Sequence, residues 1–558
     1  MTELQKKITT TDAHFTQVLE LVRRGGYAEE IEGLLRAGAG GRPRQLSVEV
    51  LFTCMIIYYE STNTIIFRHM YRYFMKNIPI PTKVKYGLSD SKGNMLVQEY
   101  QVNYLRHRIE KVLRYTSVAS GTYEVDGVKA EYFQTILDKI IDSVQPQNLP
   151  PATKYAMDST FIESNARRTA RKKDGTNSKD IDARIGHRTD TQSKPSEMAN
   201  GYDALTVTGA PVKDEDIPNI CSGLVLLPGA SDQSDAIRHI LEHQKELGRL
   251  GKKYIADKAY NNYKRERFLD ILRKYDANQC IDMRAEQHGV YFYHGIPIID
   301  GTPHCPQVLD YPELLTIIKP AVSQKEKLDP NDFAAVQAET IAKNAALGDF
   351  FSLIEQRQQF AFKHHSYTKK GRRWTAPCWK GKAICSNCPL SKGMSLDAGI
   401  PIWDNPPKTP TRGCLKERVE IPNVIYNDNG EELVNVSKAL QHDYWGSKEW
   451  FKDWNKRPRI EGTYGDLQQA DKGGIRKGWI KVTGIVNNGI ALAFALVVAA
   501  MKNIWAWQDR HPEQIADDLI CRKLPEVQFV EIPVDTLALL DSEHLEPPEI
   551  AWVMAPGR

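Results

Sequence analysis

The chain has 558 residues, of which 41% are hydrophobic and 26% are charged. These proportions are ordinary for a globular protein, and the length allows several domains. A net charge of only +4 does not by itself indicate nucleic-acid binding. The start lacks the apolar core of a signal peptide, and the longest apolar run, residues 489–501, is shorter than the about 20 residues that cross a bilayer. We therefore expect a cytoplasmic protein with no membrane segment.

The first 145 residues are predicted to be helical. Apolar side chains recur at helical spacing through residues 12–36, and the Gly-rich residues 38–45 end that helix. Ser47 is suited to cap the next helix, which is strongly apolar. Two further helical patterns follow, at residues 65–75 and 100–118.

Residues 150–275 are predicted to form strands that carry two aspartates. Residues 154–157 are typical of a short strand with Asp158 at its polar end, and residues 250–256 lead into Asp257 in a similar way. Carboxylates at strand ends of an α/β sheet face a common crevice. Each acid alone is equally compatible with a solvated carboxylate or a helix cap. Between them, residues 167–173 (RRTARKK) hold five cations.

Residues 276–450 contain a cysteine cluster. The chain has nine cysteines, an odd number that argues against a disulfide framework. Zinc binds four thiolates tetrahedrally, and a C-x-x-C turn presents two of them. The pattern predicts a structural zinc site, and reduced free thiols are the other interpretation. Its ligands would be Cys378, Cys385, Cys388 and Cys414, with His304, Cys305, His364 and His365 as alternatives.

Glu461 opens a stretch of helical character in residues 451–508. Together with Asp158 and Asp257 it suits a site for two Mg²⁺ ions, because this hard cation prefers oxygen ligands. Two such ions, roughly 3.5–4 Å apart, activate the attacking oxygen and stabilise the leaving oxygen in phosphodiester chemistry. Residues 509–558, rich in proline and acids, are expected to cover another subunit or lie on the surface.

Several of these segments resemble one known family. MDSTFIESNA (residues 157–166), SGLVLLPGASDQSDA (222–236), IADKAYNN (255–262), RIEGTYGDLQ (459–468) and ALAFALVVAAMKNIWAW (491–507) are similar to motifs of the DDE transposases of bacterial insertion sequences. The resemblance covers roughly residues 45–507. It implies that Asp158, Asp257 and Glu461 are the catalytic and metal-binding acids.

The resemblance also implies a fold class and a domain plan. The fold would be α/β, with an RNase H-like mixed-sheet catalytic core interrupted by a long insertion and preceded by an N-terminal helical DNA-binding domain. The expected parts are an end-binding helical domain (1–145), the first part of the core (150–275), the insertion (276–450), the completion of the core (451–508) and the tail (509–558).

Around the third acid, related transposases often carry Tyr, Arg, Glu and Lys, where this chain has Trp454, Arg457, Glu461 and Gln468. The Trp454 ring is suited to stack on a flipped base. Gln468 lacks the cation expected to hold a phosphate, and Lys472, one helical turn later, could substitute. The residues expected to contact DNA are Arg167, Arg168, Arg171, Lys172, Lys173, Arg372, Arg373, Trp454, Arg457, Arg459 and Lys472.

The resemblance therefore predicts cut-and-paste transposition in the nucleoid-containing cytoplasm of a bacterium. The cofactors would be two Mg²⁺ or Mn²⁺ ions, and the partners would be the terminal inverted repeats and target DNA. Because two ends must be cut and joined together, a homodimer is expected. Two alternatives are an RNase H-like nuclease without strand transfer and a domesticated or inactive DNA-binding protein.

Overall fold

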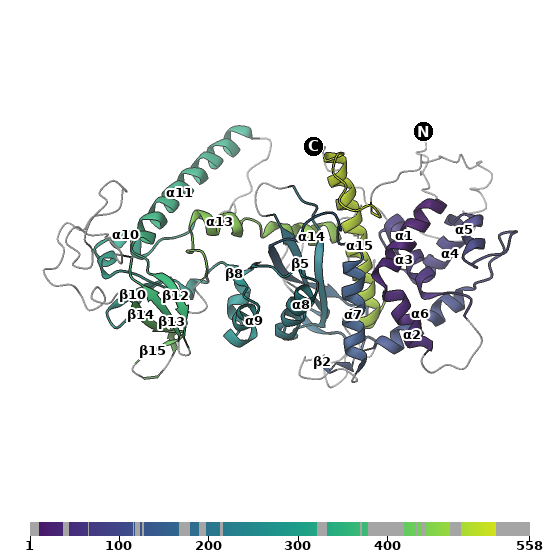
Figure 1. Ribbon diagram of the computed structural model, residues 1–558, viewed down its shortest axis with the longest axis horizontal. Helices are drawn as coiled ribbons and strands as arrows, with labels where there is room; N and C mark the ends of the chain where they lie inside the picture. Colours follow the sequence, from purple (N-terminus) through teal and green to yellow (C-terminus); the bar gives the residue numbers. More distant parts are fainter. Residues whose placement is uncertain are drawn as a thin grey trace.

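The computed structural model describes residues 10–36, 44–64, 66–114, 116–117, 123–124, 128–166, 179–188, 197–211, 216–320, 332–368, 371–377, 418–427, 429–430, 432–434, 436, 441–468 and 481–520. Three groups of elements follow one another along the long axis (Figure 1). N-terminal helices lie at one end, a mixed sheet with its helices lies in the middle, and a second group of strands with a long helix lies at the other end. The fold is mixed α/β, as expected.

Helices dominate the first part of the chain. They are α1 (Asp12–Gly25), α2 (Tyr27–Arg36), α3 (Val48–Thr62), α4 (Phe67–Asn77), α5 (Ile80–Lys85), α6 (Glu99–Leu113) and α7 (Val128–Asp142). Two short antiparallel strands, β1 (Thr116–Ser117) and β2 (Tyr123–Glu124), lie between α6 and α7 in the chain.

Local sequence signals explain where these helices begin and end. Ser47 caps α3 as expected, because its hydroxyl accepts the main-chain N–H of Val50 at 3.3 Å. The expectation of one helix over residues 12–36 is wrong. The chain breaks at Gly26, whose φ of 67° lies in the left-handed region that favours glycine.

The central sheet has six strands. They are β3 (Lys154–Glu163), β4 (Arg184–Arg188), β5 (Glu197–Ala210), β6 (Cys221–Pro228), β7 (Lys253–Ala256) and β8 (Asn278–Ile281). β3 is antiparallel to β5 on one side and parallel to β7 on the other, and β7 is parallel to β8. The long β5 also pairs antiparallel with β4 near its start and with β6 further along.

Separate hydrophobic cores cover the two faces of this sheet. On one face, Met157 and Tyr254 belong to a core that includes α8 (Ser234–Glu246) and α9 (Leu269–Lys274). On the other face, a larger core joins α7, α15 (Ile485–Arg510) and the N-terminal helices. Phe52 of α3 meets Phe494 of α15 there, with ring centroids 5.2 Å apart. The N-terminal helices therefore share their core with the sheet.

The third group of elements has a core of its own, which includes Trp374 and Ile421. Its elements are β9 (Val290–Tyr293), β10 (Ile296–Ile299), β11 (Thr302–Pro303), α10 (Pro312–Leu315), α11 (Phe333–Gln359), β12 (Lys363–Tyr367), β13 (Gly371–Thr375), β14 (Arg418–Pro422), β15 (Ile425–Tyr426) and β16 (Glu432–Val434). Helix α11 projects from this group (Figure 1). Short 3₁₀ helices are η1 (Lys258–Asn262), η2 (Arg265–Arg267), η3 (Ala285–Gln287) and η4 (Pro306–Asp310).

The chain then returns to the central sheet through α13 (Lys448–Trp454) and α14 (Pro458–Gln468) and ends its described part after α15. Within that part, α15 is the one helix long and apolar enough to span a membrane, and 78% of its most apolar stretch is buried inside the protein. The run 489–501 lies within this helix. A helix buried to this extent is typical of a protein core.

Candidate acidic site

Asp158 and Asp257 lie side by side on neighbouring parallel strands. β3 and β7 pair with Met157 opposite Ala256, so the next residue on each strand is an aspartate. Neighbouring strands are about 4.8 Å apart, and successive side chains alternate between the two faces. The two carboxylates therefore share one face of the sheet at the end of β7.

Asp158 does not end its strand. The expectation of a strand that stops at residue 157 is wrong, because β3 continues to Glu163 and all its residues pair with β5. Asp257 directly follows β7 and caps η1, where its carboxylate accepts the main-chain N–H of Lys258 at 2.7 Å. The acids thus meet beside the end of β7, in the middle of β3.

Each of these aspartates has a lysine four residues before it. Lys154 and Lys253 are paired in the same register, on the same face as the acids. Both ammonium groups donate to Asp453 of α13 at 2.6 Å. Burial opposes the ionisation of Asp453, but hydrogen bonds from the lysines around it outweigh burial and hold its pKa well below the usual range. These ion pairs fix α13 across both strands.

Helix α14 carries Glu461 to the aspartates. Its Tyr464 hydroxyl donates to the main-chain carbonyl of Asp158 at 2.6 Å and accepts a hydrogen bond from Thr206 of β5 at 2.7 Å. These bonds fasten α14 over β3 and β5. Glu461 lies three residues before Tyr464, on the same side of the helix.

The acids interact electrostatically. Burial, together with the negative charges of Asp257 and Glu461, raises the pKa of Asp158 to about 6. The Ser159 main-chain N–H, which donates to the Asp158 carboxylate at 2.8 Å, and the guanidinium of Arg457 act in the opposite direction. A carboxyl group with two acidic neighbours and a raised pKa is a candidate functional group, because a bound cation would relieve the repulsion.

In the structure, Arg457 forms an ion pair with Glu461. Its guanidinium lies 2.5 Å from the Glu461 carboxylate, one helical turn away. It also lies 5.4 Å from the ring centroid of Trp454. That ring stacks on Trp450 at 5.4 Å with an interplanar angle of 12°, and the Lys319 ammonium lies 5.4 Å from its centroid. Trp454 is therefore held in a stack of rings and cations, with one face against Trp450.

The donor set suits a hard divalent cation, because all three side chains are carboxylates. Their arrangement is not that of a formed metal centre. Among the residues that the structure describes, no group of three or more His, Cys, Asp or Glu side chains is placed to hold a metal ion. Glu461 would first have to leave Arg457, and it can do so because its side chain is half exposed, at 49%.

Other residues expected to contact DNA have different surroundings. Arg459 is partly buried, its guanidinium donates to the main-chain carbonyl of Ile217 at 2.8 Å, and burial lowers its pKa. Arg372 and Arg373 lie on β13 in the third group, and Arg372 is buried whereas Arg373 is exposed. Arg167, Arg168, Arg171, Lys172, Lys173 and Lys472 lie outside the described residues.

The predicted zinc ligands Cys378, Cys385, Cys388 and Cys414 also lie outside the described residues. Two of the alternatives have structural roles. His304 is fully buried, with one ring nitrogen 2.7 Å from the Thr302 carbonyl and the other 2.8 Å from the Tyr444 hydroxyl. Burial lowers the pKa of His304 to about 3. Cys305 beside it is buried and forms no disulfide.

Sequence reasoning missed the residues that assemble this site, namely Tyr464, Thr206, Asp453 and the paired lysines. One signal was available. Residues 154–158 read K-Y-A-M-D and residues 253–257 read K-Y-I-A-D, the same pattern of lysine, tyrosine, two apolar residues and aspartate. In the structure these segments are in register, and the rings of Tyr155 and Tyr254 stack 5.7 Å apart on the opposite face.

No protein-family model matches this chain, and no curated protein matches it either. The function of the chain is therefore inferred from the acidic site and its surroundings.

Proposed function

We propose that the chain is a DNA transposase that cuts and joins DNA with the help of two divalent metal ions. The observation that carries the proposal is the convergence of Asp158, Asp257 and Glu461, which come from distant segments and interact electrostatically. The mixed sheet supports an RNase H-like core, because its first strand lies between an antiparallel and a parallel partner. The separate group of elements between Asp257 and Glu461 supports a core with an insertion.

In this proposal the three acids hold two Mg²⁺ or Mn²⁺ ions. Such ions supply activation of the attacking oxygen and stabilisation of the leaving oxygen of a phosphodiester. The protein's own task is to present negative charge. Asp158 must be ionised, which its pKa of about 6 allows at neutral pH. Glu461 must exchange its ion pair with Arg457 for the metal site.

The same exchange would give Arg457 a new role. Once separated from Glu461, its guanidinium is available to a phosphate of the bound DNA, which arginine recognises through paired hydrogen bonds. The Arg457 guanidinium lies over the Trp454 ring, and this contact fixes the position of the guanidinium. The basic segment 167–173, the exposed Arg373 and Lys472 would add phosphate contacts along the duplex, whereas the buried Arg372 would not.

The DNA partners in this proposal are the terminal inverted repeats of a mobile element and the target duplex. Water attacks the phosphodiester at each end, and the released 3′-OH then attacks the target. Two ends must be joined together, so the active assembly is a homodimer on paired ends, in the bacterial cytoplasm. A structural zinc ion on the four cysteines of residues 378–414 remains part of the proposal.

One observation favours a second candidate, a DNA-binding protein that does not cut. Glu461 is paired with Arg457, and the described residues contain no formed metal-binding group. If this ion pair persists on DNA, the two aspartates alone hold the metal poorly. The protein would then bind ends without cleavage.

The deciding experiment incubates the full-length protein with Mg²⁺ or Mn²⁺ and a labelled duplex that carries the element's own terminal repeat. Asp257→Ala removes one acid of the site. Asp349→Ala, an exposed aspartate on α11, is the matched control. We expect nicking at the end and a joined product with the wild-type protein and the control, and neither with Asp257→Ala.

The other outcomes separate the alternatives. Binding to the end without cleavage would support the non-cutting candidate. Cleavage without preference for the end and without joined product would identify a nuclease. Cleavage that survives Asp257→Ala would overturn the assignment of the acids.

A further inference from the structure

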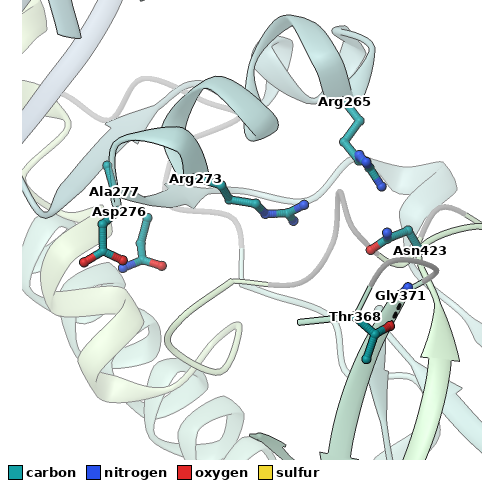
Figure 2. A pocket seen from close by; sticks show the side chains of 8 residues that line it. Arg265, Arg273, Asp276, Ala277, Thr368, Gly371 and Asn423 are labelled. Carbon is teal, nitrogen blue, oxygen red and sulfur yellow. Dashed lines mark hydrogen bonds between the residues drawn. The ribbon is translucent and has the colours of Figure 1, made fainter. Parts of the chain in front are cut away.

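A pocket lies between the central sheet and the third group of elements. It has a volume of about 370 Å³ and is lined by Arg265, Arg273, Asp276, Ala277, Asn278, Thr368, Gly371 and Asn423. One wall comes from η2, α9 and the start of β8. The other comes from the turn between β12 and β13 and the end of β14. Figure 2 shows that the Arg265 and Arg273 side chains extend into the space between these walls.

The two arginines share a single carboxylate. Arg265 donates to one oxygen of Asp270 at 2.9 Å, and Arg273 donates to the other at 3.2 Å. The guanidinium groups of Arg265 and Arg273 therefore meet at one carboxylate beside the pocket. The remaining lining acid, Asp276, lies on the other side of Arg273, away from Arg265 and Asn423 (Figure 2).

The opposite wall brings a cation, Arg372, near Arg273 and a carboxylate, Glu420, beside Thr368. Partial burial lowers the pKa of His364 on β12, and the positive charges of Arg372 and Arg273 also lower it. This places Arg372 of the third group and Arg273 of the core in one electrostatic environment. Asn423 adds a side-chain amide, whereas the Thr368 hydroxyl already donates to Glu420 at 2.6 Å.

We propose that this pocket binds a phosphate group between Arg265, Arg273 and Asn423. Guanidinium groups match phosphate oxygens in geometry as well as charge, and an amide N–H completes the donors on the other wall. The identification of this phosphate as part of a DNA backbone rests on the proposed function. The phosphate joins the core to the third group, because its donors come from both.

The pocket lies away from the acids along the sheet. Asn278, at the start of β8, pairs with Lys253, four residues before Asp257. At about 3.3 Å per residue, this separates the pocket from the acidic site by about 13 Å along the strands. The pocket therefore lies at the N-terminal ends of β7 and β8, whereas the acids lie at the C-terminal end of β7.

The test is DNA binding by the full-length protein in metal-free buffer, where cleavage does not interfere. Fluorescence anisotropy with a labelled duplex is measured over a series of salt concentrations. Arg273→Gln is expected to weaken binding about tenfold at 0.15 M salt and to reduce the salt slope by about one. The matched control is Lys274→Gln, an exposed neighbouring cation outside the pocket. It should change the affinity less than about twofold, because exposed charges are screened.

Arg265→Gln provides a second pocket variant should Arg273→Gln fold poorly, as judged by its melting temperature. Equal loss of binding in Arg273→Gln and Lys274→Gln would overturn the pocket, because only overall charge would then matter. Unchanged binding in both arginine variants would overturn it as well.

The source of the phosphate is tested by titration with inorganic phosphate. Binding of inorganic phosphate that depends on Arg273, together with no such dependence for DNA, would overturn the DNA backbone as ligand. The pocket and the transposase activity are tested independently of each other. DNA binding that depends on Arg273 in a protein that never cuts would refute the transposase and leave the pocket in place.

Discussion

Tyr464 and Asp158, 306 positions apart, are joined by a hydrogen bond of 2.6 Å from the tyrosine hydroxyl to the aspartate's main-chain carbonyl. The bond connects the helix that carries the third acid to the strand that carries the first. Thr206 donates to the same hydroxyl from the adjacent strand, so the tyrosine is held in one orientation. Tyr464 therefore positions Glu461 relative to Asp158 without touching the proposed metal ions.

Tyr464→Phe should impair the site because it loosens the placement of Glu461 relative to Asp158, although no proposed metal ligand is removed. The ring remains, but the bond to the Asp158 carbonyl is lost, at a cost of about 1 kcal/mol in the free energy of unfolding. We expect a larger loss in the rate of DNA cleavage and a weaker apparent affinity for Mn²⁺, both measured at saturating DNA.

Tyr155→Phe is the matched control for that change. Tyr155 lies on the opposite face of the same strand, and its hydroxyl donates to the Arg249 main-chain carbonyl at 2.8 Å. Its loss should destabilise the fold to a similar extent and leave Mn²⁺ affinity unchanged. If both variants lower the Mn²⁺ affinity equally, Tyr464 has only a structural role.

Asp158→Asn should stabilise the metal-free protein at neutral pH. The pKa of Asp158 is raised from its ordinary 3.8 to about 6 in the folded state, first by burial. Between these two values the folded protein binds the proton more tightly than the unfolded chain, so the free energy of unfolding falls as pH rises. At pH 8 the variant, which has no charge to bury, should be more stable by about 1–3 kcal/mol.

Denaturation at several pH values checks this sign. The difference between Asp158→Asn and the wild type should shrink as pH falls below 6 and vanish at about pH 3 and below, where the wild-type carboxyl is protonated in both states. Mg²⁺ should raise the melting temperature of the wild type at pH 8 and have little effect on the variant. A variant less stable than the wild type at pH 8 would contradict the raised pKa.

Sequence patterns located the three acids, because each lies in a short motif of recognisable character. They also gave the strongly apolar α3 and its cap at Ser47, since capping and apolar content are local properties. The extent of β3 was not predictable. Residues 159–163 are only half buried, and they extend the strand because β5, about 40 residues later, pairs with them.

The partners of Arg459 and Asp453 could not be predicted either, because they depend on contacts between distant parts of the chain. Arg459 looked like a phosphate ligand beside the third acid, yet the carbonyl that it binds belongs to Ile217, 242 positions away. The role of Asp453 likewise depends on the register of β3 and β7, which brings two lysines together. Such partners follow from strand pairing and not from local composition.

Arg457→Gln should strengthen metal binding. The wild-type guanidinium neutralises Glu461 at 2.5 Å and adds positive charge next to Asp158. Because the pair is partly exposed, its removal is worth about 0.5–1 kcal/mol, or a roughly two- to fivefold higher affinity for Mn²⁺ at pH 8. Titration calorimetry in the absence of DNA measures this directly.

Arg459→Gln, in the first turn of α14, is the control for a positive charge near Arg457. Its guanidinium is engaged with the Ile217 carbonyl, so the Mn²⁺ affinity should stay the same while stability falls. The predicted trade-off for Arg457→Gln is weaker binding of DNA ends. Tighter metal binding combined with unchanged end binding would refute the exchange of Glu461 for a DNA phosphate.

Asp453→Asn should be the most destabilising of these changes. Its carboxylate is 4% exposed and receives hydrogen bonds from Lys154, Lys253 and Lys456. Neutralising it leaves partly buried cations without their shared anion, at a cost of about 3 kcal/mol. The pKa of Asp453 is lowered in the folded state, so its contribution is present above pH 4 and is lost as pH falls further. The stability difference from wild type should therefore be constant from pH 5 to 8 and shrink below pH 4.

Asp235→Asn, which removes a pair at an aspartate that is 84% exposed, should change nothing measurable. A loss in Asp453→Asn no larger than in this control would show that α13 is held by its buried tryptophan and phenylalanine and not by the ion pairs.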